Sequence, residues 1–228
     1  MNNIITIDGP AGSGKSTIAK ILSKELGLKY IDTGAMYRAL TLLALGNNLD
    51  FQDEASILKI AKKTKIELDY RVTDEKGFTK IKLNGIDVTD EIRSKEVGAA
   101  VSIVSKLSGV RRYLVKMQRS IAKGNKVILE GRDTGSIVCP NAILKVFLTA
   151  NLGERVKRRK LQLEEKKQEI KVKLIRDEMI SRDKIDSNRK DSPLIIPENG
   201  VVIDTTNMSI NEVVEMIRKI YWERLNES

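Results

Sequence analysis

One short segment near the start of the chain limits its fold more than any other feature. The segment Gly9–Ser16 consists of a glycine, four further residues and then Gly-Lys-Ser. The apolar run Ile4–Ile7 precedes it, and apolar residues at helical spacing follow it from Ile18 to Leu26. A glycine-rich loop between a buried strand and a helix turns several backbone N–H groups toward one anion. The segment therefore predicts a strand–loop–helix unit that binds a nucleoside triphosphate.

The side chains of this loop suit the phosphates of ATP. Lys15 supplies a mobile cation for the β- and γ-phosphates, Ser16 offers a hydroxyl to magnesium, and Thr17 can donate to the α-phosphate. We therefore expect ATP together with Mg²⁺, and Ser16 is the metal ligand that the sequence assigns. The expected ATP-binding residues are Gly9, Pro10, Ala11, Gly12, Ser13, Gly14, Lys15, Ser16 and Thr17.

Composition narrows the class of protein. The 228 residues include no histidine and a single cysteine, Cys139. These counts exclude a histidine-based triad, a histidine-ligated metal, an intramolecular disulfide and a cysteine-only zinc site. The sequence shows neither a leader-peptide pattern nor an apolar run long enough for a membrane helix. We expect one domain with inserted subdomains in the reducing cytoplasm, with Cys139 buried as a small apolar residue.

The charge balance points to an anionic partner. Lys and Arg number 41 against 31 Asp and Glu, a formal net charge of +10. Residues 154–190 alone carry 14 basic and 8 acidic side chains. Aromatic residues make up only 4% of the chain, too few for the stacking surfaces of a typical single-strand binder. Small phosphorylated molecules are therefore expected as partners, rather than nucleic acid or a membrane.

Short apolar runs alternate with helical patterns along most of the chain. The strand-like runs lie at 4–7, 29–32, 126–129, 144–148 and 201–203. Strands that alternate with helices predict an α/β fold in which helices cover both faces of a parallel sheet. Ser209–Glu212 has the spacing of a capping box and predicts the start of a last helix.

Two stretches interrupt this alternation. Residues 66–88 alternate apolar with polar side chains, and Asp74–Gly77 and Asn84–Gly85 lie between the runs as turn sequences. This pattern predicts a small antiparallel sheet within an insertion. The basic stretch 151–190 is helical in composition.

Charged side chains follow two further strands at their carboxyl ends. Asp32–Arg38 follows the second strand, where small residues before Arg38 favour a loop that presents a guanidinium to a phosphate. Arg132 and Asp133 follow the third strand. Because the carboxyl ends of parallel strands surround the ligand crevice, both segments are expected to meet the phosphate-binding loop. The residues concerned are Thr33, Arg38, Arg132 and Asp133.

A third cluster lies within the basic stretch. Arg182, Asp186 and Arg189 are spaced at i, i+4 and i+7, which predicts one face of a helix. A single arginine is more often a partner in a surface ion pair. Three arginine-containing segments ordered around a phosphate-binding loop favour an anion site instead.

Four segments together carry a resemblance to a known family. They are Ile7–Ser16, Asp32–Arg38, Glu130–Gly135 and Arg182–Arg189, in this order over nearly the whole chain. In these segments and in the antiparallel insert, the chain resembles the bacterial cytidylate kinases. The resemblance implies a P-loop NTPase-type parallel sheet flanked by helices, with a core at 1–34, 109–150 and 191–228, a nucleoside-monophosphate-binding insert at 35–108 and a short helical lid at 151–190.

The resemblance also implies an activity, the transfer of the γ-phosphoryl group of ATP to CMP or dCMP. For the acceptor phosphate it implies Arg38, Arg132 and Arg189, for the cytosine Ser102, Arg111 and Asp133, and for the sugar hydroxyls Arg182 and Asp186. Thr33 stands where many members have serine and keeps the hydroxyl. The implied catalytic residues are Lys15, Arg132 and two lid arginines, Arg158 and Arg159.

The chemistry of the base agrees with a cytosine acceptor. A carboxylate such as Asp133 accepts a hydrogen bond from the exocyclic amine of cytosine, whereas uracil presents a carbonyl there. Two alternatives stay open, a kinase for another small acceptor (UMP, AMP or shikimate) and an RNA-binding NTPase. ATP and CMP or dCMP are the expected partners of a monomer, and no carboxylate ligand for magnesium is assigned.

Overall fold

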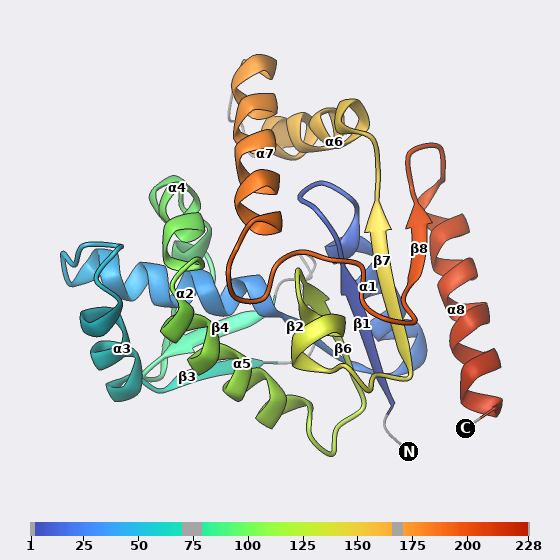
Figure 1. The fold of residues 1–228 in the computed structure, drawn as a ribbon, viewed down its shortest axis with the longest axis horizontal. Coiled ribbons are helices and arrows are strands. Elements are labelled where there is room, and N and C mark those ends of the chain that lie inside the picture. The colour runs from blue at the N-terminus through green and yellow to red at the C-terminus, as the bar shows by residue number, and fades with distance from the viewer. Residues whose placement is uncertain (1–2, 70–78, 166–170, 228) are drawn as a thin grey trace.

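The computed structural model describes residues 3–69, 79–165 and 171–227, and its centre is a five-stranded parallel sheet (Figure 1). The strand order is β2-β6-β1-β7-β8. The strands are β1 (Ile4–Asp8), β2 (Lys29–Asp32), β6 (Val127–Gly131), β7 (Leu144–Thr149) and β8 (Val201–Asp204). The predicted parallel sheet is therefore confirmed, with β1 and its phosphate-binding loop at the centre.

Helices cover both faces of this sheet. Ile5 and Ile7 of β1 pack in one cluster with α1 (Lys15–Leu26) and α8 (Ile210–Asn226). Ile4, the neighbour of Ile5, packs on the opposite face with α5 (Ser108–Ala122). Alternate residues of a strand point to opposite faces, so a strand buried on both faces has mostly apolar side chains at successive positions. This explains the nearly continuous apolar runs of the sequence, in which Thr6 of β1 is a buried polar exception.

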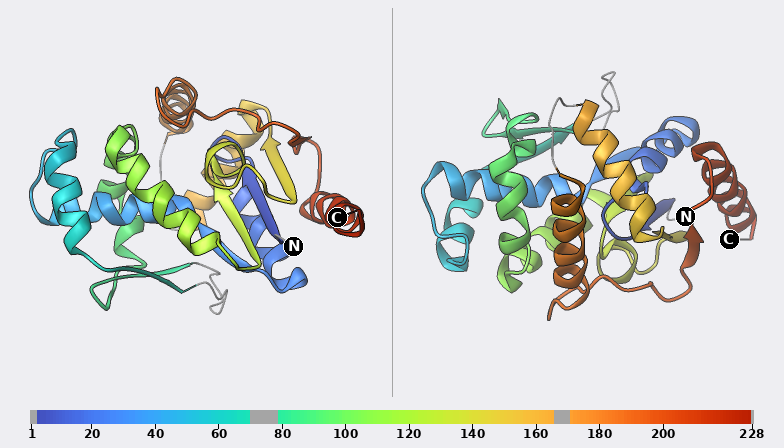
Figure 2. Two further views of the ribbon diagram at one scale, coloured as in Figure 1. Left: turned by 60° about the horizontal axis from the view of Figure 1, so that its bottom comes forward. Right: turned by 90° about the horizontal axis from the view of Figure 1, so that it is seen from above.

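The chain between β2 and β6 builds a second core. It contains α2 (Thr33–Gly46), α3 (Glu54–Lys63), α4 (Lys95–Val104) and a 3-10 turn at Glu91–Arg93. A separate antiparallel sheet joins β3 (Ile66–Asp69), β4 (Lys80–Leu83) and β5 (Ile86–Asp87) in that order. In this second core, Leu40, Ile57 and Ile81 pack with Leu114 of α5. Because α5 also packs against the parallel sheet, it contributes to both cores. Figure 2 shows α3 and α8 at opposite ends of the molecule.

The predicted antiparallel insertion is confirmed within the described residues. Asn84 and Gly85 connect β4 to β5 with φ angles of 51° and 84°, the left-handed pair that a tight hairpin turn requires. The expected turn at Asp74–Gly77 lies outside the described residues. The division of the chain at residues 35, 109, 151 and 191 stays a prediction.

Two helices lie above the carboxyl ends of the central strands (Figure 1). They are α6 (Leu152–Glu165) and α7 (Val172–Ser187), and Val156 of α6 packs with Ile175 and Met179 of α7. Each described helix is too short or too polar to cross a lipid bilayer.

Two local expectations were wrong. Thr33–Arg38 is not a loop but the start of α2, because the Asp32 carboxylate accepts from the backbone N–H of Ala35 at 3.0 Å and caps the helix. Arg189 does not share a helix with Arg182 and Asp186, because α7 ends at Ser187. The capping box at Ser209 and Glu212 is confirmed.

Candidate active site

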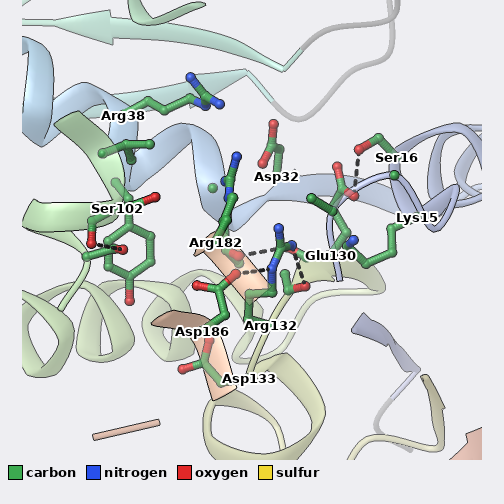
Figure 3. Close-up of a pocket in the computed structure, with 18 of the residues that line it drawn as sticks. Lys15, Ser16, Asp32, Arg38, Ser102, Glu130, Arg132, Asp133, Arg182 and Asp186 are labelled. Atoms are coloured by element: carbon green, nitrogen blue, oxygen red, sulfur yellow. Dashed lines mark hydrogen bonds and ion pairs between the residues drawn. The ribbon is translucent and has the colours of Figure 1, made fainter. Parts of the chain in front are cut away.

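A cavity of about 260 Å³ lies at the carboxyl ends of β1, β2 and β6, and residues of α7 also line it. Figure 3 shows many of its lining side chains. It collects residues from the phosphate-binding loop, the second core and both upper helices. The predicted site residues that line it are Ala11, Gly12, Lys15, Ser16, Thr33, Arg38, Ser102, Arg111, Arg132, Asp133, Arg159, Arg182, Asp186 and Arg189. All the residues expected to bind the acceptor therefore surround one space.

The phosphate-binding loop lies along one side of this cavity. Gly9 has a φ angle of 147°, and a Cβ atom there would lie 2.0 Å from the carbonyl oxygen of Leu148, so no larger residue fits. Lys15 starts α1, and its ammonium donates to the carbonyl of Pro10 at 2.6 Å. Burial, and next the charge of Arg132, lower the pKa of Lys15 to about 7. The Lys15 side chain is therefore withdrawn from bulk water and lies at the cavity, where a bound anion would favour its charged form.

Several members of the expected ATP-binding set do not line the cavity. Pro10 and Ser13 form the loop itself, since the Ser13 hydroxyl donates to the Pro10 carbonyl at 3.0 Å. Thr17 is exposed on α1. Gly9 and Gly14 shape the turn through positive φ angles. Backbone N–H groups, rather than these side chains, are what such a loop offers to phosphate.

Sequence reasoning missed Glu130, which is buried at the end of β6 and lines the cavity. Its carboxylate accepts from the hydroxyl of Ser16 at 2.8 Å and from the hydroxyl of Tyr30. Burial, and next the charge of Asp32, raise the pKa of Glu130. The signal that could have found it is its place near the end of a strand, two residues before Arg132. Figure 3 shows Ser16, Asp32 and Glu130 on the same side of the cavity.

Arginine side chains crowd the middle of the cavity. The Nε of Arg132 donates to Asp186 at 2.8 Å, and Arg189 lies 3.6 Å from the same carboxylate. Burial, and next the charges of Arg132 and Arg38, lower the pKa of Arg182 to about 10. Burial also lowers the pKa of Arg38. Like charges this close repel one another, so the cluster gains stability when an anion binds among them.

A buried ion pair closes the far end of the cavity. Nη2 of Arg111 donates to Asp133 at 2.6 Å, and both side chains are almost fully buried. The Arg111 guanidinium lies over the Tyr37 ring, with its Cζ atom 5.0 Å from the ring centroid. Ser102 of α4 also lines the cavity. Tyr37 was also missed, although it stands inside the Asp32–Arg38 segment.

The two arginines that the sequence assigned to a lid differ in position. Arg159 lines the cavity, whereas Arg158 lies outside it and donates to the Thr205 hydroxyl at 2.9 Å and to Glu154 at 3.0 Å. Arg155, which the sequence did not single out, donates to the Ala11 carbonyl at 3.2 Å. It also pairs with Asp183 of α7 at 2.6 Å. Among so many basic residues, no sequence signal marked Arg155 as the link between these helices and the phosphate-binding loop.

Comparisons with known proteins identify the family of this chain. Residues 5–223 match the family model described as "Cytidylate kinase". A cytidylate kinase of Caldanaerobacter subterraneus subsp. tengcongensis is 49% identical over 93% of this chain and 92% of its own length. One from a Geobacillus strain is 46% identical over 98% of this chain and 99% of its own.

A solved structure shows the fold alone. It is that of an uncharacterised protein from Eubacterium ventriosum, with 14% identity and a TM-score of 0.53 over 96% of this chain and 97% of that one. The family match and the relatives carry the assignment. This chain belongs to the cytidylate kinase family.

Proposed function

We propose that this protein transfers the γ-phosphoryl group of ATP to CMP or dCMP and so forms ADP and CDP or dCDP. One observation carries the proposal: a single cavity joins Lys15 of the phosphate-binding loop to the buried Arg111–Asp133 pair, with the arginine cluster between them. The names of the relatives support the same acceptor.

Phosphoryl transfer needs alignment and positive charge more than covalent chemistry. We assign Lys15 to the β- and γ-phosphates, and Arg38, Arg132 and Arg189 to the acceptor phosphate. We assign Arg182 and Asp186 to the sugar. Arg159 lines the cavity, and we assign it to the charge on the transferred group. Arg158, which donates to the Thr205 hydroxyl, would support Arg159 from outside the cavity. The absence of histidine costs this mechanism nothing.

The residues beside Ser16 fit a magnesium ion. Mg²⁺ is usually held by one or two carboxylates together with substrate phosphates, and it keeps several waters. The Ser16 hydroxyl already meets the Glu130 carboxylate, and Asp32 pairs with Glu130 across β2 and β6. Within the described part of the chain, no group of three or more acidic or cysteine side chains could enclose an ion without substrate. When bound, Mg²⁺ would neutralise charge on the phosphate oxygens.

The Arg111–Asp133 pair would read the base. With one oxygen held by Arg111, the other oxygen of Asp133 can accept from the exocyclic amine of cytosine. UMP would place a carbonyl against this carboxylate and leave a buried acceptor unpaired. This observation favours CMP and dCMP over UMP. Adenine also carries an exocyclic amine, so it is the names of the relatives that favour CMP over AMP and shikimate.

We infer that the protein works as a cytoplasmic monomer on small molecules. Its net charge of +10 also fits an RNA-binding NTPase, but the arginines that carry the argument converge inside a cavity rather than along an open surface. Filter binding to RNA at two salt concentrations separates the two, because binding through phosphates must weaken steeply with salt.

A coupled assay tests the proposed function directly. The purified protein is supplied with ATP and Mg²⁺ and with CMP, dCMP, UMP, AMP or shikimate in turn, and ADP release is measured. We expect the highest kcat/KM for CMP or dCMP. Faster turnover of any other acceptor contradicts the proposal.

A further inference from the structure

Asp8 is a buried carboxylate that the proposed chemistry does not use. It is the last residue of β1, it directly precedes Gly9, and it is fully buried. Its charge counteracts the lowering of the Lys15 pKa, and its side chain reaches the turn that follows the neighbouring strand β6. It accepts three hydrogen bonds there, from the N–H of Thr134 at 2.9 Å, the hydroxyl of Thr134 at 2.8 Å and the N–H of Gly135 at 2.7 Å.

These bonds hold a single helical turn, Thr134–Val138, that begins directly after Asp133. The Asp133 carbonyl accepts from the N–H groups of Ile137 at 2.9 Å and Val138 at 3.1 Å. The N–H groups that start such a turn have no partner within it. The Asp8 carboxylate therefore caps the turn from another strand, and the main chain of Asp133 is held in place from its carboxyl side.

The turn lies directly against β1. A Cβ atom added at Gly135 would lie 2.7 Å from the Thr6 hydroxyl and 3.3 Å from the Asp8 carboxylate. The glycine therefore lets the turn approach the strand closely enough for the three hydrogen bonds. With Arg111 holding the Asp133 side chain and Asp8 holding the turn behind it, Asp133 is fixed from two sides.

Stability alone does not favour a carboxylate here. Burial raises the pKa of Asp8 to about 6, in spite of the hydrogen bonds from Gly135 and Thr134 that lower it. The charged form at neutral pH therefore costs folding free energy. A neutral residue would avoid that cost but would cap the turn less completely.

We propose that Asp8 is a positioning residue for acceptor recognition, whose carboxylate holds the turn after Asp133 so that Asp133 and Arg132 face the cavity. The inference rests on the proposed function of that cavity. Loss of the carboxylate should affect the acceptor more than ATP. The backbone of Asp8 is paired on both sides, with β6 and with β7, and these pairings keep Gly9 in place.

The test compares three variants with the intact chain. Asp8→Asn keeps the shape of the side chain but replaces one oxygen by an NH₂ group. This group would face a donor of Thr134 or Gly135, which would then lose its acceptor. Thr134→Val removes only the hydroxyl donor, and Thr134→Ser restores it. Steady-state KM is measured separately for CMP and ATP, CMP binding is measured by calorimetry without ATP, and the preference for CMP over UMP is determined.

We expect Asp8→Asn to raise the KM and Kd for CMP by about tenfold, the loss expected for one or two buried hydrogen bonds. The preference for CMP over UMP should fall. The KM for ATP should rise much less than the KM for CMP, since Asp8 acts on Lys15 only through its charge. Thr134→Val should raise the KM and Kd for CMP by about threefold with a smaller effect on the KM for ATP, and Thr134→Ser should have values close to those of the intact chain. A matched rise for both substrates, or an unchanged KM for CMP in a folded variant, overturns the inference.

Failure of the proposed function gives a different result. It would show in the intact chain, as slower turnover of CMP and dCMP than of another acceptor. The KM for that other acceptor is then compared with the KM for ATP in each variant, so the role of Asp8 is tested in either case. If Asp8→Asn does not fold, the comparison of Thr134→Val with Thr134→Ser tests the inference. A KM for CMP that is raised as much in Thr134→Ser as in Thr134→Val would also overturn it.

Discussion

Single side chains determine the charge of the cavity. Arg38, Arg132, Arg182 and Arg189 share a small, partly buried space in which Asp186 pairs with two of them. Guanidinium groups hold phosphate oxygens through parallel N–H donors, which makes arginine better suited than lysine to grip a phosphate in one orientation. The surplus positive charge is the feature that a phosphorylated substrate would neutralise.

Arg38→Ala should reduce kcat/KM for CMP by about a hundredfold or more, because it removes an anchor of the acceptor phosphate. Stability should change little, since the Arg38 guanidinium makes only a 3.4 Å contact to the Ile92 carbonyl among its described hydrogen bonds. Steady-state kinetics and thermal melting measure the two effects. Arg112→Ala, an exposed arginine outside the cavity, is the matched control. A variant that is merely unstable would indicate a structural role.

Asp133→Asn should shrink the preference for CMP over UMP, because the amide can donate to the carbonyl of uracil. The variant should also lose stability, by about 3 kcal/mol, because Arg111 is left as a buried charge without its partner. The ratio of kcat/KM for the two nucleotides is measured at a temperature where melting shows the variant folded. An unchanged ratio would remove Asp133 from base recognition.

Side-chain hydrogen bonds near their N-termini orient two helices that line the cavity. The Asp32 carboxylate caps α2, which sets the start of the helix that carries Arg38. The Arg155 side chain ties α6 to the Ala11 carbonyl and to α7, so the upper helices are held to the phosphate-binding loop. Such contacts orient whole elements, and a change in one of them is transmitted to every side chain that the element carries.

Ser209→Ala should lower the free energy of unfolding by about 1 kcal/mol, because it removes the capping box of α8. Activity should be unchanged, since none of the described residues of α8 lines the cavity. Urea unfolding and the coupled assay measure these outcomes. Ser209→Asp keeps a capping side chain and serves as the control. A loss of activity in a folded Ser209→Ala would connect α8 to the site.

At the scale of the whole molecule, the cavity lies between two hydrophobic cores. Lys15 begins α1 and Glu130 lies in β6, next to the first core. Arg38 and Ser102 lie on α2 and α4 of the second core, and Arg182 lies on α7 above (Figure 3). Neither core alone contains a complete set of groups for donor and acceptor. The helices α6 and α7 line the cavity from above and, in the proposed function, would exclude water and so protect ATP from hydrolysis.

The stability of the molecule should depend on pH through Asp8. Its folded pKa of about 6 lies above the ordinary value of 3.8, chiefly through burial and to a lesser degree through the charge of Asp133. A raised carboxyl pKa contributes stability below the unfolded value, and that contribution is lost as the pH rises through about 6, up to about 3 kcal/mol in total.

Asp8→Asn cannot titrate, so the stability of the intact chain relative to this variant should increase as the pH falls from 7 to 5. Urea unfolding of both proteins at each pH measures the difference. Comparing the two chains cancels the titration of the other carboxyl groups. A difference that is independent of pH would show that the Asp8 pKa is not raised.

Local sequence determined much of this protein. The glycine pattern at Gly9–Ser16, the apolar runs of the strands and the Asn84–Gly85 turn each depend on neighbours within a few residues, and each appears in the structure as expected. The motif residues Arg38, Arg132 and Asp133 were found because they follow strands, and the ends of parallel strands gather at one edge of the sheet.

Tertiary structure alone decided the contacts between distant residues. Ser16 and Glu130 are separated by 114 positions and Arg155 and Ala11 by 144, so no local pattern could pair them. Asp8 and Gly135, 127 positions apart, meet only because β1 and β6 pair side by side. Arg158 likewise donates to the hydroxyl of Thr205, a distant residue, and so lies outside the cavity that the sequence assigned to it. Short-range patterns specify elements, whereas partners across the sheet depend on how the elements pack.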